Sequence, residues 1–306
     1  MKIAWIGYLD PFCFNGGGEL TNRAVIEAGR ERGHEIVVSG WLRGRPQRAL
    51  RRLGLHRRLR VAWDAELFIL ANVHNVPQRR DRIPDAVLER ALDSGRAVLF
   101  ADAWVDVCPF DMPCGGDRAR CPAGCRRDWA NRAYARAAAA AFVSPMQQRM
   151  IGAVLDTPLP PVVFARPLVD PEHFRDTGEE RTIDVLYVGS IERKKGYDAL
   201  IERFGADRLT FAGRNGLGEP VAGTYLGPLP QAELPALYNR ARHFAHLPEW
   251  HEPMGRTVAE AALCGCELIT NERVGVLSYD RGDYADPAVV ATNATRFWVD
   301  LEAAVR

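Results

Sequence analysis

The segment VLYVGSIERKKGYDALIERF (residues 185–204) joins an apolar run, a glycine, a basic cluster, a second glycine and a helical pattern. An unbroken run of β-branched and aromatic residues indicates a strand buried on both faces of a parallel sheet. Strand, turn and helix in this order predict one unit of an α/β domain. The turn contains Arg193, Lys194 and Lys195, which would neutralise a diphosphate without a metal ion. Charge runs are usually solvated faces, but the two flanking glycines favour the functional interpretation.

Similar apolar runs recur on both sides of this segment. Five come before a proline-rich stretch and five after it, at 2–8, 35–40, 66–72, 97–103 and 138–144, then at 183–189, 209–213, 224–227, 243–247 and 267–271. The stretch TPLPPVVFARPLVDP (157–171) contains five prolines and is predicted to be a connection between domains. We expect two doubly wound, Rossmann-like α/β domains, residues 1–165 and 166–306, facing each other across a cleft.

The composition of the 306 residues is that of a globular protein, with 47% hydrophobic and 26% charged residues. The 40 Lys and Arg and the 39 Asp and Glu leave a net charge of +1, so the chain as a whole has no attraction to nucleic acid or membrane. No apolar run approaches the ~18 residues of a membrane span, and the first residues lack the features of a signal peptide. The expected location is the cytoplasm.

A glycine loop, NGGGE (15–19), separates the first predicted strand from a helical pattern. Gly17 and Gly18 would let the backbone approach a ligand, and the helix N-terminus would favour an anion. The spacing is not GxGxxG, so the nicotinamide-dinucleotide fingerprint is missing. A plain flexible loop is the alternative, and spacing alone does not decide between the two.

Two glutamates eight residues apart mark the segment HLPEWHEPMGRTVAEAALCGCELITNE (246–272). A helix is expected to begin near Gly255, and an eight-residue helical step rotates a side chain by about 80°, so Glu252 and Glu260 would face roughly the same cleft. Carboxylates bind sugar hydroxyls strongly. Alternatively, Glu252 is an ordinary acidic residue near a helix start. Three backbone N–H groups at the helix start would suit a phosphate, those of Gly255, Arg256 and Thr257.

These motifs together resemble the retaining nucleotide-sugar glycosyltransferases of the GT-B fold, family 4. The opening of that family is similar to NGGGELTNRAV (15–25) followed by RGHEIVV (32–38), and its K-G turn is similar to VGSIERKKG (188–196). Its E-x7-E segment is similar to EPMGRTVAEAALCGCELITN (252–271). The resemblance covers nearly the whole chain, and the order of the K-G and E-x7-E segments is its most specific part.

The resemblance implies a donor site mostly in the second domain. Lys195 would bind the donor diphosphate, Glu260 the ribose hydroxyls and Glu252 the transferred sugar. Further contacts to the phosphates are implied for Gly17, Gly18, Gly255 and Arg256. The family often has arginine after the glycine of this turn, where the present chain has Ser190, so Arg193 or Lys194 is expected to supply the missing charge.

Four cysteines lie within the loop 108–125, at Cys108, Cys114, Cys121 and Cys125, with the spacing C-x5-C-x6-C-x3-C. Four thiols in a short loop suit a tetrahedral, structural zinc ion. An iron–sulfur cluster and two disulfides are the alternatives, of which a reducing cytoplasm disfavours the disulfides. Some family-4 enzymes have a similar cysteine-bearing insertion after an HD-x-W segment.

The residues at the HD-x-W position are Ala101, Asp102, Ala103 and Trp104. The family commonly has a histidine where this chain has Ala101, and that histidine faces the donor sugar. Asp102 is one candidate for its role, and His74, at the end of another predicted strand, is a second. A histidine in such a place is more often structural.

The resulting hypothesis is a metal-independent retaining glycosyltransferase that uses a UDP-, GDP- or dTDP-sugar. The acceptor stays open between a glycan, a lipid-linked glycan, a natural product and modified DNA. The alternatives are a catalytically impaired GT-B protein that binds sugar nucleotides or a partner, and a sugar-nucleotide epimerase. The arginine-rich segment Arg43–Arg60 would meet an anionic partner, such as the inner face of a membrane, or is a solvated helix.

Overall fold

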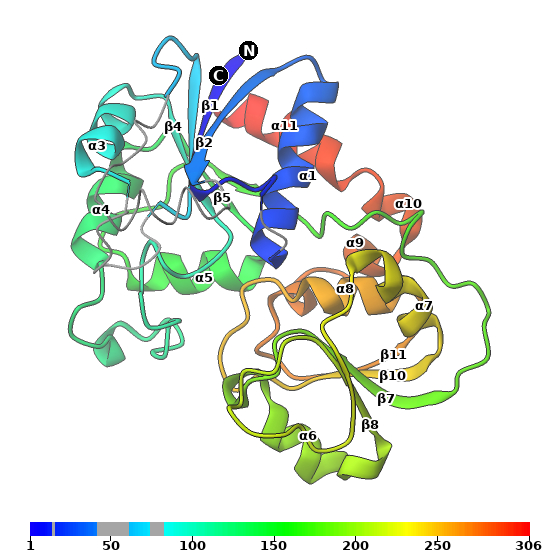
Figure 1. Cartoon of the computed structure of the whole chain (residues 1–306). Coiled ribbons are helices and arrows are strands. Elements are labelled where there is room, and N and C mark those ends of the chain that lie inside the picture. Colours follow the sequence, from blue (N-terminus) through cyan, green and yellow to red (C-terminus); the bar gives the residue numbers. More distant parts are fainter. Residues whose placement is uncertain (14–15, 42–60, 74–82) are drawn as a thin grey trace. The chain divides into compact units, whose positions relative to one another are not determined.

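The computed structural model of the chain describes residues 1–13, 16–41, 61–73 and 83–306 (Figure 1). The described residues form two compact units, each of which is described here by itself. The first unit contains Met1–Leu168 and Ala294–Arg306, and the second contains Val169–Asn293.

The first unit is built on a six-stranded parallel sheet with the strand order β2-β1-β3-β4-β5-β6. Its strands are β1 (Lys2–Leu9), β2 (Glu35–Trp41), β3 (Leu67–Ala71), β4 (Ala97–Ala101), β5 (Ala139–Phe142) and β6 (Val162–Phe164). Every residue of β3, β4 and β5 is buried, as expected for parallel strands with both faces covered.

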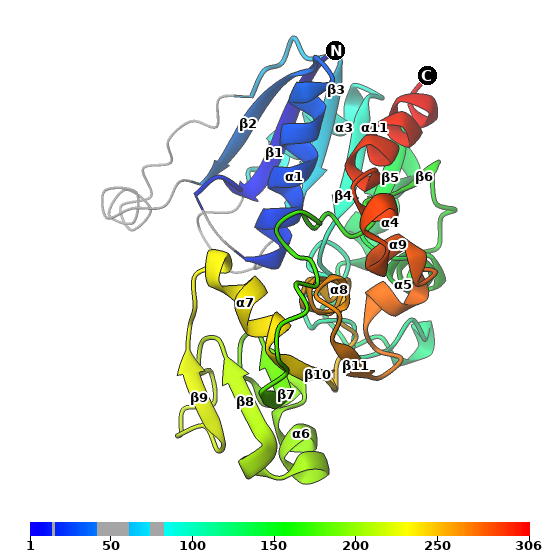
Figure 2. The same cartoon turned by 90° about the vertical axis from the view of Figure 1, so that its right-hand side faces the viewer.

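The helices of the first unit are α1 (Gly17–Glu31), α3 (Asp85–Asp93), α4 (Arg127–Arg136), α5 (Pro145–Val154) and the C-terminal α11 (Asn293–Ala304). Figures 1 and 2 show α11 beside α1. The contact is close, since Trp298 of α11 donates a hydrogen bond from Nε1 to the backbone carbonyl of Val25 at 2.8 Å. Trp298 also packs over Gly29 of α1, where a Cβ atom would lie 2.4 Å from its ring.

The second unit has a five-stranded parallel sheet with the strand order β11-β10-β7-β8-β9. Its strands are β7 (Ile183–Val188), β8 (Leu209–Ala212), β9 (Thr224–Gly227), β10 (Ala241–His246) and β11 (Glu267–Thr270). Its helices are α6 (Tyr197–Phe204), α7 (Leu234–Asn239), α8 (Arg256–Leu263), α9 (Gly282–Ala285) and α10 (Pro287–Val290). In both views α6 covers one face of this sheet, whereas α7 and α8 cover the other (Figures 1 and 2).

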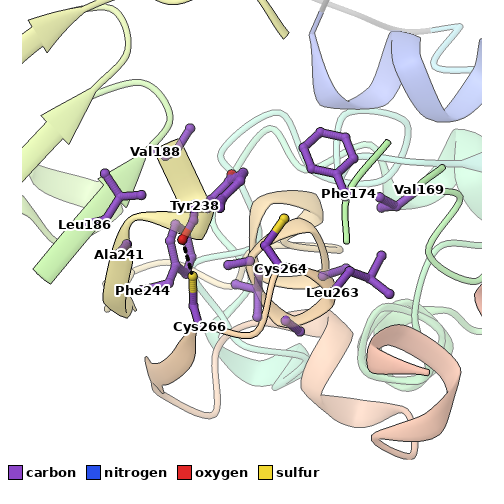
Figure 3. Close-up of a cluster of buried hydrophobic side chains, with 14 of the residues drawn as sticks. Val169, Phe174, Leu186, Val188, Tyr238, Ala241, Phe244, Leu263, Cys264 and Cys266 are labelled. Atoms are coloured by element: carbon purple, nitrogen blue, oxygen red, sulfur yellow. Dashed lines mark hydrogen bonds between the residues drawn. The ribbon is translucent and has the colours of Figure 1, made fainter. Parts of the chain in front are cut away.

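Two apolar clusters follow from the alternation of side chains along β7. Val185 and Tyr187 pack on the side of α6, and Leu186 and Val188 pack on the side of α7 and α8. Figure 3 shows the second cluster, in which Cys264 and Cys266 lie among the apolar side chains and the Cys266 thiol donates to the backbone carbonyl of Tyr238 at 3.2 Å. These two cysteines therefore act as small core residues.

The α/β class with two Rossmann-like, doubly wound sheets agrees with the sequence prediction. Two details differ. The proline-rich stretch is more than a connection, because Val162–Phe164 form β6 at the edge of the first sheet, where a neighbouring proline does not interrupt a central ladder. The last helix returns to the first unit, which the division at residue 165 did not include, because its apolar face is covered by α1.

None of the helices in the described part of the chain has the length and apolar character needed to cross a bilayer.

Candidate functional site

A partly buried ion pair lies at the carboxyl edge of the second sheet. Lys195 ends the short turn Arg193–Lys195 that follows β7, and its Nζ donates to Glu252 Oε2 at 3.0 Å and to Oε1 at 3.3 Å. The two side chains are only 22% and 17% exposed. Gly196 allows this turn, because its φ is +92° and a Cβ atom would lie 2.0 Å from the carbonyl oxygen of Leu247.

His246, the last residue of β10, is a third member of this cluster. Its Nε2 lies 3.5 Å from Glu252 Oε2, and its side chain is almost fully buried. Burial by itself would raise the pKa of Glu252, but the Lys195 ammonium and His246 outweigh it and hold that pKa at about 2. Glu252 is therefore a carboxylate at neutral pH, and it stays one well into acid.

Trp250 supports the basic turn from the other side. The Nζ atoms of Lys194 and Lys195 lie 4.9 and 5.3 Å from the centre of its ring. These are cation–π distances, so the indole attracts both ammonium groups and limits where they point. The Nε1 atom of Trp250 is buried and lacks a hydrogen-bond partner among the described residues.

Helix α8 begins beside this cluster without a capping side chain. Its N-cap is Gly255, with φ +83°, and a Cβ atom there would lie 2.4 Å from Val274. Glu252 precedes the helix and forms a parallel bridge with Val274, which corrects the expectation of a helical relation between the two glutamates. Gly255, Arg256 and Thr257 do form the helix start, as the spacing predicted.

Glu260 has a different environment from Glu252. It is buried in α8, where Oε2 accepts from the Tyr238 hydroxyl at 3.1 Å and Oε1 accepts from Arg256 Nε at 2.9 Å. Burial raises the pKa of Glu260, and Arg256 and Tyr238 offset this only in part. The guanidinium of Arg256 is thus directed to Glu260, and its backbone belongs to the helix start.

Arg193 forms ion pairs with two carboxylates. The sequence predicted that its charge would be directed to the donor phosphates. Its guanidinium pairs with Asp198 and, at 2.5 Å, with Glu219, and the side chain is mostly exposed. Lys194 lies over Trp250. At Ser190, the backbone carbonyl accepts a hydrogen bond from the Tyr187 hydroxyl at 2.8 Å.

Asp102 lies at the carboxyl edge of the first sheet, directly after β4. Asn72, directly after β3, donates from Nδ2 to Asp102 Oδ1. Burial, together with the nearby Glu19 and Asp106, raises the pKa of Asp102 to about 7, although hydrogen bonding opposes the shift. Gly18 lies against the other carboxyl oxygen, whereas Gly17, the first residue of α1, is exposed. Ala101 is buried in β4.

Two sequence predictions lie outside the described residues. These are His74 as a catalytic candidate and the segment Arg43–Arg60 as the contact for an anionic partner.

The cysteine loop brings its thiols into contact. Cys121 Sγ lies 3.7 Å from Cys114 Sγ, and the Cys125 thiol donates to the backbone carbonyl of Val107 at 3.3 Å. Cys125 also interacts with the thiols of Cys108 and Cys121, so a chain of contacts links all four. Across the described ranges, however, no three or more His, Cys, Asp and Glu side chains are arranged to hold a metal ion.

Comparison with known proteins gives the same architecture. No protein-family model matches the chain, and no curated protein is significantly similar to it in sequence. Among solved structures, sucrose-phosphate synthase from Thermosynechococcus elongatus superposes with a TM-score of 0.64 at 14% identity, over 100% of this chain and 95% of that one. Anabaena HepE in complex with UDP gives 0.63 at 16%, over 99% and 98%. A glycosyltransferase from Rickettsia africae gives 0.60 at 11%, over 99% and 97%.

The chain has the GT-B fold.

Sequence reasoning about this GT-B chain missed three polar residues that share these sheet edges: His246, Trp250 and Asn72. Two of them had a usable signal, because His246 ends a predicted strand and Asn72 closes another, and ligand-binding side chains gather at the carboxyl ends of parallel strands. Trp250 had none, since an aromatic residue in a loop is more often part of a core.

Proposed function

We propose that this chain is a glycosyltransferase that moves a sugar from a nucleotide-diphospho-sugar to an acceptor hydroxyl, with retention of configuration and without a catalytic metal ion. The observation that carries the proposal is the partly buried pair of Lys195 and Glu252, with His246, at the carboxyl edge of the second sheet. Ligands of open α/β sheets bind at this edge. The uncapped start of α8 adjoins it and favours phosphate oxygens.

The chemistry of the cluster suits the departure of a diphosphate. As the bond to the anomeric carbon breaks, negative charge develops on the leaving group, and the Lys195 ammonium and the N–H groups at the start of α8 stabilise it. Glu252 stays ionised, so it holds the side chain of Lys195 by an ion pair and offers a carboxylate oxygen to a sugar hydroxyl. The described cluster has no carboxylate free of a cation to act as a nucleophile, which favours attack of the acceptor on the face that the leaving group departs from. An oxygen of the departing diphosphate then takes the proton of the acceptor hydroxyl.

The donor is proposed to be a UDP-sugar, with UDP-glucose as the first probe. Similar GT-B structures were solved with UDP, and HepE also with UDP-glucose, which supports trying this base and sugar before GDP- and dTDP-sugars.

The test measures UDP-glucose binding by calorimetry and its slow hydrolysis by chromatography, with and without EDTA. Lys195→Ala is expected to lower turnover at least a hundredfold. The variant lacks the ammonium that stabilises the departing diphosphate, and the negative charge of Glu252 stays beside that group. The matched control is Lys2→Ala, since Lys2 is a surface lysine paired with Asp64 and Glu35. Equal turnover in both variants would reject the proposal, as would binding without turnover of any donor. Full activity in EDTA supports metal independence, and proton NMR of the product reports the anomeric configuration.

A structural zinc ion in the cysteine loop is a second part of the proposal. The 3.7 Å between Cys114 Sγ and Cys121 Sγ is close to the ~3.8 Å edge of a tetrahedron with Zn–S bonds of about 2.3 Å. Because the described residues hold no three such side chains in a metal-binding arrangement, zinc binding would require the loop thiols to move.

Elemental analysis of the reduced full chain tests the zinc proposal. One zinc ion per chain is expected, lost in Cys121→Ser and retained in the matched control Cys13→Ser. Metal-free protein in which all four loop thiols react with Ellman's reagent would contradict it.

A further inference from the structure

Several cations at the carboxyl edge of the second sheet are already engaged by carboxylates. Lys195 pairs with Glu252, and Arg193 pairs with two carboxylates. The Arg256 guanidinium donates to Glu260. A diphosphate carries several negative charges at neutral pH, whereas the pair of Lys195 and Glu252 has no net charge. A cation that no carboxylate neutralises would add the attraction that this ion pair lacks.

Arg214 is a cation of the same edge with a different environment. It lies two residues beyond the end of β8, and its side chain is exposed. Across the described part of the chain, no hydrogen bond or ion pair engages its guanidinium. Its positive charge is therefore available to a ligand, unlike the charge of Arg193.

The backbone of Arg214 is held against the turn that follows β7. Its carbonyl oxygen accepts a hydrogen bond from the Ile191 N–H at 2.9 Å, beside a parallel bridge between Ile191 and Asn215. Gly213 allows the two segments to approach, since a Cβ atom there would lie 1.8 Å from the carbonyl oxygen of Gly189. The pairing of β7 with β8 thus continues past the strand ends and fixes Arg214 beside the basic turn.

The alternation of side chains places Arg214 on the side of the sheet that α8 covers. Ile191 belongs to the cluster on the side of α6, and its bridge partner Asn215 has the same orientation. Arg214 precedes Asn215 and so has the opposite orientation, as does Ala212 of β8. Ala212 belongs to the cluster of Figure 3, together with Val258 of the first turn of α8. Arg214 therefore lies on the side of the sheet edge where α8 begins.

The strand order brings Arg214 into line with the ion pair. In the order β10-β7-β8, Glu252 comes after β10, Lys195 after β7 and Arg214 after β8. Neighbouring strands are about 4.8 Å apart, and their carboxyl ends meet at one edge. A guanidinium can hold two phosphate oxygens at once through its paired N–H groups. Lys195 and Arg214 are thus spaced to bind one extended anion.

We propose that Arg214 binds the diphosphate of the sugar donor, as a cation of this site that no described carboxylate neutralises. This assignment replaces the expectation that Arg193 supplies that charge. It rests on the proposed function for the identity of the donor, whereas the binding of a diphosphate to Arg214 is tested independently of sugar transfer.

The first experiment measures the binding of UDP and of inorganic pyrophosphate to the full chain by calorimetry. Arg214→Gln should weaken the binding of both probes at least tenfold, because the variant lacks the charge and the paired N–H groups. Arg214→Lys restores the charge alone, so it should bind both probes more tightly than the glutamine variant does. The proposal would be overturned by a wild-type chain that binds neither probe, by unchanged affinity in Arg214→Gln, or by a lysine variant as weak as the glutamine variant.

The matched control is Arg203→Gln, at an exposed arginine in the last turn of α6. This helix covers the other face of the same sheet, and the Arg203 guanidinium lies 5.3 Å from the centre of the Phe204 ring. The control should bind both probes as the wild type does. Thermal unfolding verifies that all the variants fold, and an equal loss of affinity in the control would overturn the assignment to Arg214.

The salt dependence separates a charged contact from a merely structural effect. Salt screens exposed charges, since the Debye length falls from about 10 Å at 0.1 M to about 3 Å at 1 M. The ratio of UDP affinities between the wild type and Arg214→Gln should therefore shrink at least threefold between about 0.1 M and 1 M NaCl. A ratio that salt leaves unchanged would contradict the proposal.

Donor turnover keeps this outcome apart from that of the proposed function. A chain that binds UDP and pyrophosphate through Arg214 but turns over no sugar nucleotide would refute the proposed function and leave the diphosphate contact intact. Conversely, unchanged UDP binding in Arg214→Gln, together with a loss of UDP-glucose turnover in Lys195→Ala, would overturn the role of Arg214 and leave the proposed function standing.

Discussion

Each of the two parallel sheets ends in a buried carboxyl group, and the two groups differ in their protonation. Glu252, at the edge of the second sheet, lies between Lys195 and His246, and its pKa is lowered to about 2. Asp102, at the edge of the first sheet, lies among amides and near Glu19 and Asp106, and its pKa is raised to about 7. Both are desolvated, so the neighbouring charges decide the direction.

The comparison shows that one architecture places two carboxyl groups in different electrostatic environments. Glu252 has an ammonium within hydrogen-bond distance, whereas Asp102 accepts a hydrogen bond from the amide of Asn72. The difference is produced by a few residues after the strands, and the sheets themselves are alike.

The largest effect is expected from breaking the ion pair of the second sheet. Lys195→Ala leaves the partly buried Glu252 with only His246 beside it, which should cost about 3 kcal/mol of unfolding free energy in addition to the loss of donor turnover. The double variant Lys195→Ala, Glu252→Gln should regain most of that stability and none of the turnover. Urea unfolding measures the unfolding free energies of the wild type, the two single variants and the double variant. Additive losses in the double variant would show that the two residues are not coupled.

The two carboxyl groups should give stability opposite dependences on pH. Glu252 has a folded pKa below its ordinary 4.5, so it contributes up to about 3 kcal/mol above pH 4.5, and this is lost as the pH falls toward 2. Asp102 has a folded pKa above its ordinary 3.8, so its ionisation costs up to about 4 kcal/mol as the pH rises from 4 through 7.

Urea unfolding between pH 3 and pH 8 tests this pair of signs. Glu252→Gln should flatten the acid limb, and Asp102→Asn should be more stable than the wild type at pH 8 and equal to it near pH 4. A less stable Asp102→Asn at pH 8 would contradict the raised pKa.

The glycines at the two helix starts should respond differently to alanine. Gly255→Ala puts a Cβ 2.4 Å from Val274 in a left-handed backbone, so a loss of about 1–3 kcal/mol is expected. At Gly17 no heavy atom of the described residues lies within 4 Å of the added Cβ, and Gly17→Ala should gain about 0.5 kcal/mol. Thermal unfolding compares them, and equal changes would show that the helix starts are not different in packing.

The smallest effect is expected at the aromatic support of the basic turn. Trp250→Leu removes a cation–π partner of Lys194 and Lys195, worth about 0.5–2 kcal/mol, so KM for UDP-glucose should rise three- to tenfold with kcat within about twofold. The matched control is Trp63→Leu in the first unit, where Arg90 lies 4.0 Å from the ring centre. A selective fall in kcat would indicate that Trp250 acts on the transferred sugar instead.

Much of the site could be predicted because strand order brings sequence-distant turns together. The motifs assigned Lys195 and Glu252 to one donor site, and the structure shows that the residues after β7 and β10 meet because these strands are neighbours in one parallel sheet. Their ion pair was not predicted. The helix start near Gly255 was predicted, but Glu252 precedes α8 and bridges to Val274, so a helical step does not set its direction relative to Glu260. The sequence carried no sign of the two carboxylates beside Arg193, because Asp198 and Glu219 reach it only in the folded chain.

The sequence alone determined the α/β class, the repeated strand–helix order and the positions of the glycines at the helix starts, because these depend on local patterns of apolar and turn residues. Only the tertiary structure decided which carboxyl group is charged, since burial and neighbouring charges are set by residues far apart in the chain. Asp102 and Glu252 are both acids after or near a strand end, and it is their surroundings that raise the pKa of one and lower the pKa of the other.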